Sequence, residues 1–171
     1  PDLIVGASVG QYVEVRSGQD GSLLLFLNGP SGFGNSVDGL GDVDGDGRSD
    51  LMVGSWSELN ATGSGGAVRV LSGASGAELY KCEADEDNDY LGWSISGGKD
   101  VNGDGVPDFI AGAPNARPHP WYGNAMGEAR VYSGRDGATL YTMNGARAGG
   151  EFGTAVALVD DLDGDGLPDL A

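Results

Sequence analysis

One acidic nonapeptide occurs three times in this chain, at 42–50, 100–108 and 161–169. Every copy follows the pattern D-x-[DN]-x-D-G-x-x-D, with oxygen-bearing side chains at positions 1, 3, 5 and 9 and glycine at position 6. Calcium takes about six to eight oxygen ligands, and a loop with this spacing supplies most of them if position 7 adds its backbone carbonyl. The sequence therefore predicts up to three Ca²⁺ sites per chain. The predicted ligands are Asp42, Asp44, Asp46, Arg48, Asp50, Asp100, Asn102, Asp104, Val106, Asp108, Asp161, Asp163, Asp165, Leu167 and Asp169.

The nonapeptides differ from the loop of an EF-hand, which needs a glutamate at position 12 and a helix on each side. Position 12 is Val53 in the first copy and Ala111 in the second, and both copies run into short apolar segments typical of strands. We therefore expect each loop to join two β-strands and its last aspartate to complete the site. Because Asn102 leaves only three carboxylates in the second copy, we expect weaker calcium binding there.

The similarity between repeats extends beyond the loops, since the first aspartates fall at positions 42, 100 and 161. An apolar-Gly pair precedes every loop, at 33–34, 91–92 and 152–153. A glycine follows the closing aspartate in the two complete repeats, and then come a β-prone segment ending in Ser-Gly and one further apolar segment. Each repeat thus supplies four short strands. This organisation predicts an all-β fold, a β-propeller built from four-stranded antiparallel blades.

These motifs resemble the FG-GAP repeats of the integrin α-chain β-propeller. Phe33-Gly34 and Phe152-Gly153 correspond to the FG element, and Gly112-Ala113-Pro114 corresponds to the GAP element. The second repeat has Leu91 in place of phenylalanine, and the first has Trp56 in place of the GAP proline. The resemblance implies a calcium-binding, non-catalytic scaffold for protein recognition or adhesion, and it implies an extracellular or otherwise extracytoplasmic location.

The phase of the repeats divides the chain into four segments. Residues 1–32 are expected to form strands two to four of one blade, 33–90 and 91–151 a full blade each, and 152–171 a first strand, a calcium loop and the start of a second strand. Three blades' worth of strands cannot close a propeller of about four to eight blades. We expect the ring to be closed by a second copy, giving a head-to-tail homodimer with six blades, or by further sequence.

Composition excludes several classes of function. The formal charge is −17 and the isoelectric point about 4.1, which argues against binding to nucleic acid or to an anionic membrane surface. The chain has no run of about eighteen apolar residues, so no membrane insertion is expected. It has one histidine, and its clustered carboxylates are already assigned to metal, so we expect no enzyme activity and no catalytic residue.

The long and dissimilar segments 56–66 and 114–127 are the predicted ligand-binding loops. Their candidate residues, Trp56, Arg117, His119, Trp121 and Tyr122, suit a protein loop or a glycan, although these aromatics could equally pack the loops onto the blades. Trp93 is expected between blades, and the acidic segment 83–89 is expected to be solvated. Two alternatives to protein recognition stay open: a lectin-like carbohydrate-binding propeller, and a purely architectural or engineered repeat assembly without a ligand.

Overall fold

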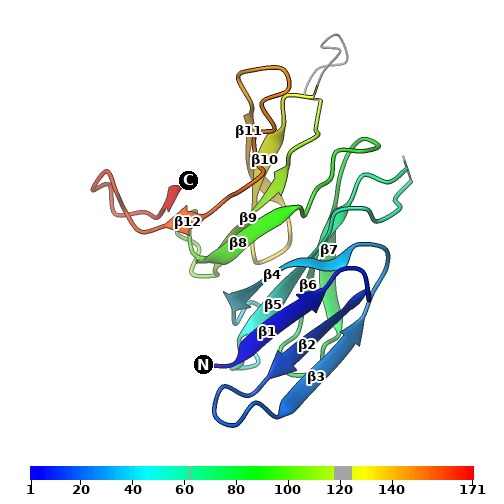
Figure 1. The fold of residues 1–171 in the computed structure, drawn as a ribbon. Helices are drawn as coiled ribbons and strands as arrows, with labels where there is room; N and C mark the ends of the chain where they lie inside the picture. The colour runs from blue at the N-terminus through cyan, green and yellow to red at the C-terminus, as the bar shows by residue number, and fades with distance from the viewer. Residues whose placement is uncertain (62, 118–124) are drawn as a thin grey trace.

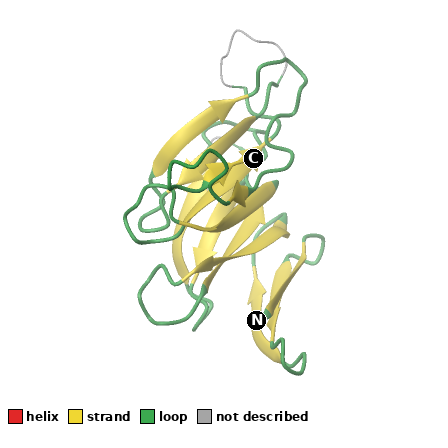
Figure 2. Cartoon of the chain, turned by 90° about the vertical axis from the view of Figure 1, so that its left-hand side faces the viewer, coloured by secondary structure: helices red, strands yellow, loops and turns green. Residues whose placement is uncertain are grey.

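The computed structural model describes residues 1–61, 63–117 and 125–171, and these residues form thirteen β-strands. Figure 2 shows strands and loops throughout, and no helix is drawn in the described ranges. Among the described residues there is accordingly no helix with the length and apolarity that crossing a bilayer requires.

The strands form antiparallel sheets whose members follow one another in the chain (Figure 1). The first sheet has three strands: β1 (Leu3–Ala7), β2 (Tyr12–Arg16) and β3 (Leu23–Asn28). The second has four: β4 (Phe33–Gly41), β5 (Asp50–Ser55), β6 (Ala67–Leu71) and β7 (Glu78–Glu83). The third also has four: β8 (Ser94–Lys99), β9 (Asp108–Ala113), β10 (Glu128–Tyr132) and β11 (Thr139–Asn144). The last pairs β12 (Leu158–Val159) with β13 (Asp169–Leu170).

The four-stranded meanders are propeller blades, so the all-β prediction is confirmed. The first three sheets share one plan, because a register shift recurs where the last two strands of each sheet pair. It lies between Val15 and Arg16 in β2, between Val70 and Leu71 in β6, and between Val131 and Tyr132 in β10. Bulges of this kind increase the local twist of a strand pair.

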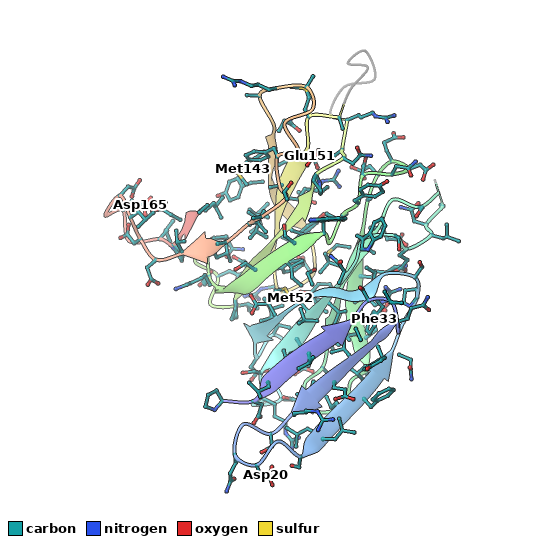
Figure 3. The ribbon with its side chains drawn as sticks, in the orientation of Figure 1. Asp20, Phe33, Met52, Met143, Glu151 and Asp165 are labelled. Atoms are coloured by element: carbon teal, nitrogen blue, oxygen red, sulfur yellow. The ribbon has the colours of Figure 1, made fainter. Side chains whose placement is uncertain are left out.

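The core lies between the sheets, because alternate side chains of a strand point to opposite faces. Leu51 and Val53 of β5 pack against the β1–β3 sheet, whereas Met52 between them packs toward the β8–β11 sheet (Figure 3). Phe109 and Ile110 of β9 divide in the same way between the core on one side and the core on the other. The second strands of the two four-stranded sheets, β5 and β9, are therefore buried on both faces along their whole length.

Neighbouring sheets approach most closely where a second strand meets the first strand of the next repeat. A Cβ atom on Gly54 would lie 2.2 Å from the carbonyl oxygen of Gly92, and one on Gly112 would lie 1.8 Å from that of Gly153. The same two carbonyls accept hydrogen bonds of 2.8 Å from the hydroxyls of Ser36 and Ser94. These positions require glycine, which explains why the motif glycines recur at fixed spacing.

Candidate metal loops and the opposite loop surface

The three nonapeptides connect the first two strands of their sheets: 42–50 joins β4 to β5, 100–108 joins β8 to β9, and 161–169 joins β12 to β13. Figure 3 shows Asp165 on a loop that projects away from the sheets. The structure thus confirms that strands flank the loops.

Backbone amides hold the acidic side chains of the first loop in place. Asp42 accepts hydrogen bonds from the amides of Gly45 at 2.7 Å and Gly47 at 2.8 Å. Both glycines have positive φ, +80° and +85°, a conformation that side chains disfavour. Asp46 accepts from the amide of Arg48 at 2.8 Å. Asp100 and Asp161 repeat the first arrangement, and Asp104–Val106 and Asp165–Leu167 repeat the second.

Carboxylates gather closely in two of the loops. Oxygen atoms of Asp42, Asp44 and Asp50 lie within 4.8 Å of one another, and so do those of Asp161, Asp163 and Asp169. Loss of solvation raises the pKa of Asp44, and the charges of its acidic neighbours add to this effect. A set of hard oxygen donors gathered at this distance fits a divalent cation such as Ca²⁺. The roles of the individual ligands, including the carbonyls of Arg48, Val106 and Leu167, stay predictions.

The closing aspartates of the first two loops also anchor the rest of their sheets. Asp50 is 1% exposed and accepts from the amides of Val43 at 2.8 Å and Gly73 at 3.0 Å. Asp108 is fully buried and accepts in the same way from Val101 and Gly134. Burial raises the pKa of Asp108, and the amide hydrogen bonds oppose that shift. The half-buried Asp169 accepts from Leu162 at 2.6 Å, without the bond to a third strand.

The second loop is contacted by a cation from the turn between β10 and β11. Arg135 donates from Nε to the carboxylate of Asp104 at 3.1 Å and from a terminal nitrogen to its carbonyl at 2.8 Å. This hydrogen bond lowers the pKa of Asp104. Asn102 stands where the other loops have a third carboxylate, and among the described residues the close acidic triplets are confined to the first and third loops.

At the other end of the sheets the structure groups aromatic side chains differently from the prediction. Trp56 contacts Tyr90 and Trp93 edge-on, with ring centroids 5.1 and 5.6 Å apart. Trp93 is 38% exposed, so the expectation that it lies in the core between blades was wrong. Arg117 is exposed, whereas His119, Trp121 and Tyr122 lie outside the described residues. Tyr90 and Trp93 could have been recognised in the sequence as members of this group, because they lie on either side of the Leu91-Gly92 pair.

A cavity of about 150 Å³ adjoins this aromatic group. It is lined by Tyr90, Trp93, Pro114, Asn115, Glu151 and Thr154. Two of these residues, Tyr90 and Glu151, have positive φ values of 64° and 50°. Sequence reasoning missed this cavity, because it is assembled from three loops far apart in the chain.

The acids at this end have partners within the protein. Buried Glu58 pairs with Arg69 and Lys81, and Arg130 pairs with Glu128 and with Asp85. Asp87 accepts from the amide of Ser64 at 2.6 Å, and Asp89 is 4% exposed. The segment 83–89 was expected to be solvated, and its acids Glu83, Asp85, Glu86 and Asp87 are exposed, whereas Asp89 is buried.

Comparison with known proteins agrees with this architecture. The FG-GAP repeat family model matches residues 91–134. Integrin alpha-5 of Xenopus laevis is 32% identical over 144 residues, which is 81% of this chain and 13% of that protein. Integrin alpha-V of Gallus gallus is 34% identical over 84 residues, 49% of this chain and 7% of that protein. Phosphatidylinositol-glycan-specific phospholipase D of Bos taurus is 36% identical over 90 residues, 47% of this chain and 10% of that protein.

The chain therefore spans only a small part of the length of these relatives, between 7% and 13%. Within that part, an apolar-Gly pair, an acidic loop and a four-stranded sheet recur together at the spacing of the repeat. This chain is an FG-GAP repeat protein of the integrin α-chain-like propeller type.

Proposed function

We propose that the chain is a calcium-stabilised, non-catalytic propeller segment for protein recognition or adhesion. The observation that carries the proposal is the gathering of three carboxylates within 4.8 Å of one another in the first and third loops. Calcium bound there supplies charge neutralisation and a tie between the first and second strands. Three such ions would change the formal charge from −17 to −11.

In this proposal the calcium loops stabilise the fold, and the opposite end of the sheets binds the protein partner. Backbone amides hold the acids of the loops in place, so the oxygen donors are ordered before an ion binds. The similarity to integrin alpha-5 and alpha-V supports adhesion or recognition, and an extracytoplasmic location with abundant calcium, as the class of function. The similarity to a phospholipase D covers 10% of that enzyme, and we assign this chain no catalysis.

We also infer that a second copy covers the two outer sheet faces, as a head-to-tail homodimer with six blades. The outer face of the β1–β3 sheet carries Leu3, Val5, Leu24 and Phe26, each about half exposed. At the other side of the molecule, a groove of about 270 Å³ is lined by residues that include Met143, Phe152 and Leu170. Exposed sheets with apolar faces favour association. Further blades from the same protein would cover these faces equally well.

Three measurements test these proposals. Titration calorimetry with Ca²⁺ should show binding that chelation reverses, and absence of heat at millimolar calcium would contradict the metal sites. Calcium-loaded chain should bind at least one member of a panel of purified ectodomains, and binding confined to a glycan array would favour the carbohydrate alternative. Light scattering after size exclusion should give twice the chain mass of 17.3 kDa, and a stable monomer would remove the dimer.

A further inference from the structure

The β8–β11 sheet packs against a neighbouring repeat on each side, and the two interfaces differ in the residue that lies between the loops. At the first interface, between the β4–β7 and β8–β11 sheets, Trp56 fills the space between the loops. A Cβ atom on Gly32 would lie 3.3 Å from its ring, and its other neighbours are Tyr90 and Trp93 of the next repeat. The chain thus places its own indole between two consecutive repeats.

At the second interface, between the β8–β11 sheet and the following repeat, the equivalent of Trp56 is Pro114. Both residues stand two positions after the close-approach glycine, in Gly54-Ser55-Trp56 and Gly112-Ala113-Pro114. The walls correspond as well, since the residues before and after the apolar-Gly pair are Tyr90 and Trp93 in one repeat and Glu151 and Thr154 in the next. The smaller proline leaves the cavity of about 150 Å³ where the first interface holds an indole.

We propose that this cavity, the aromatic socket, binds one tryptophan or tyrosine side chain of a protein partner. The socket consists of Tyr90, Trp93, Pro114, Asn115, Glu151 and Thr154. Its volume suits one side chain, because drug-sized ligands occupy about 300–1,000 Å³. Aromatic residues anchored in such pockets dominate the energetics of many interfaces. This inference rests on the proposed recognition function and names the chemistry that the surface recognises.

Stacked rings form the apolar wall of the socket. The rings of Tyr90 and Trp93 are 6.3 Å apart and inclined by 29°, within the range of favourable aromatic pairs. Opposite them lie the exposed carboxylate of Glu151 and the hydroxyl of Thr154, next to the amide of Asn115. Indole N–H and phenol O–H groups need a hydrogen-bond acceptor when they are buried, and these groups provide one.

The backbone of the socket is held in an unfavourable conformation. The residue before the apolar-Gly pair has positive φ in all three repeats: Gly32 at 76°, Tyr90 at 64° and Glu151 at 50°. Glycine accepts this conformation readily, whereas a bulky side chain there is an outlier. Such strain concentrates at ligand sites. The two repeats that form the socket therefore carry functional side chains at a position where glycine would be more stable.

Hydrogen bonds fix the polar wall in advance. Asn115 donates from its side chain to the carbonyl of Asn88 at 2.6 Å and from its backbone to that of Asp89 at 3.2 Å. The hydroxyl of Thr154 donates to the carbonyl of Glu151 at 2.6 Å, and its oxygen retains the capacity to accept a hydrogen bond. A site that is already ordered loses less entropy when a ligand binds.

The test is an NMR titration of the calcium-loaded chain with N-acetyl-L-tryptophanamide, and in parallel with N-acetylglucosamine. We expect saturable shifts of the amides of Asn115, Glu151 and Thr154 with the aromatic probe, with a Kd on the order of 1 mM. Shifts with the sugar alone would overturn the proposal in favour of a glycan. Absence of shifts at saturating aromatic probe would overturn it as well.

Two substitutions sharpen the test. Thr154→Trp, at an exposed position, places an indole in the socket and should weaken probe binding at least tenfold, whereas Thr142→Trp on the exposed side of β11 should not. Trp56→Ala should open a second socket at the first interface and add a second binding event, and an unfolded variant would be recognised by its melting curve. Unchanged binding in Thr154→Trp overturns the proposal. If an ectodomain from the panel still binds that variant, the recognition function stands and only the socket fails.

Discussion

The two ends of the sheets treat their carboxylates in opposite ways. At the end with the nonapeptides, the acids are mostly exposed, recur three times in the same pattern and are held by backbone amides. At the other end, individual acids are accommodated in different ways: Glu58 pairs with Arg69, Glu128 pairs with Arg130, and Asp89 is buried. On the proposal that the loops bind calcium, an added cation neutralises the acids of the first end, whereas the second end uses its own arginines and lysines.

The clustered carboxylates of the nonapeptide loops repel one another. Two like charges at about 5 Å repel by roughly 0.8 kcal/mol even at the dielectric constant of water. In the first and third loops three carboxylates lie within 4.8 Å of one another, and among the described residues the second loop has no such triplet. A calcium ion removes this repulsion. The ion pairs at the opposite end leave no comparable repulsion to remove.

Removal of calcium from the nonapeptide end is expected to have the largest effect on the stability of the fold. If each loop binds with calcium at about ten times its Kd, the ion contributes about 1.4 kcal/mol per loop, or about 4 kcal/mol for three. Chelation should therefore lower the Tm by roughly 10 °C, measured by differential scanning calorimetry at constant ionic strength. Added Mg²⁺ is the control, since its smaller octahedral shell fits such loops poorly. An unchanged Tm in chelator would show that the loops are acidic turns without a metal role.

Substitution of the closing aspartates should have the next largest effect on the free energy of unfolding. The effect should be larger in the first loop than in the third. Asp50→Ala leaves the partly buried amides of Val43 and Gly73 without their acceptor, a loss of about 3 kcal/mol. Asp169→Ala removes one bond from a half-buried site, a loss of about 1 kcal/mol. Denaturant unfolding in chelator measures both without a contribution from metal. Equal losses would mean that the bond between Asp50 and the third strand is unimportant.

At the opposite end, Asp89 provides a pH-dependent test. Burial raises its pKa to about 6, against the amide of Glu86 and the charge of Arg130, while Glu128 and Glu86 add to the rise. Because the folded pKa exceeds the unfolded value, this group stabilises the fold fully below about pH 4, and the contribution disappears as the pH rises through 6. Asp89→Asn should therefore increase the free energy of unfolding by about 2 kcal/mol at pH 7 and by nothing at pH 4. A pH-independent difference between the two proteins would contradict this.

The sequence allowed prediction of the repeated parts of the molecule and little of the rest. Strand order and loop position follow from spacing, because each has copies that reinforce one another. The aromatic socket and the pairing of Arg130 with Asp85 were not foreseen, since each depends on one side chain meeting a distant segment. Trp93 illustrates why the surroundings of a single side chain could not be predicted. Its place beside the motif glycine was evident, but its exposure depends on where Trp56 packs.

Arg135 is the exception at the nonapeptide end, because it gives the second loop a cation of its own. Asn102→Asp should restore a fourth carboxylate and raise the calcium affinity of that loop about tenfold, equivalent to about 1.4 kcal/mol. Asp44→Asn is the reciprocal change and should weaken the first loop by a similar factor. Titration calorimetry on both variants, each in the presence and absence of Arg135→Ala, separates the lost carboxylate from the competing guanidinium. If Arg135→Ala alone equalises the first two sites, the arginine and not Asn102 distinguishes them.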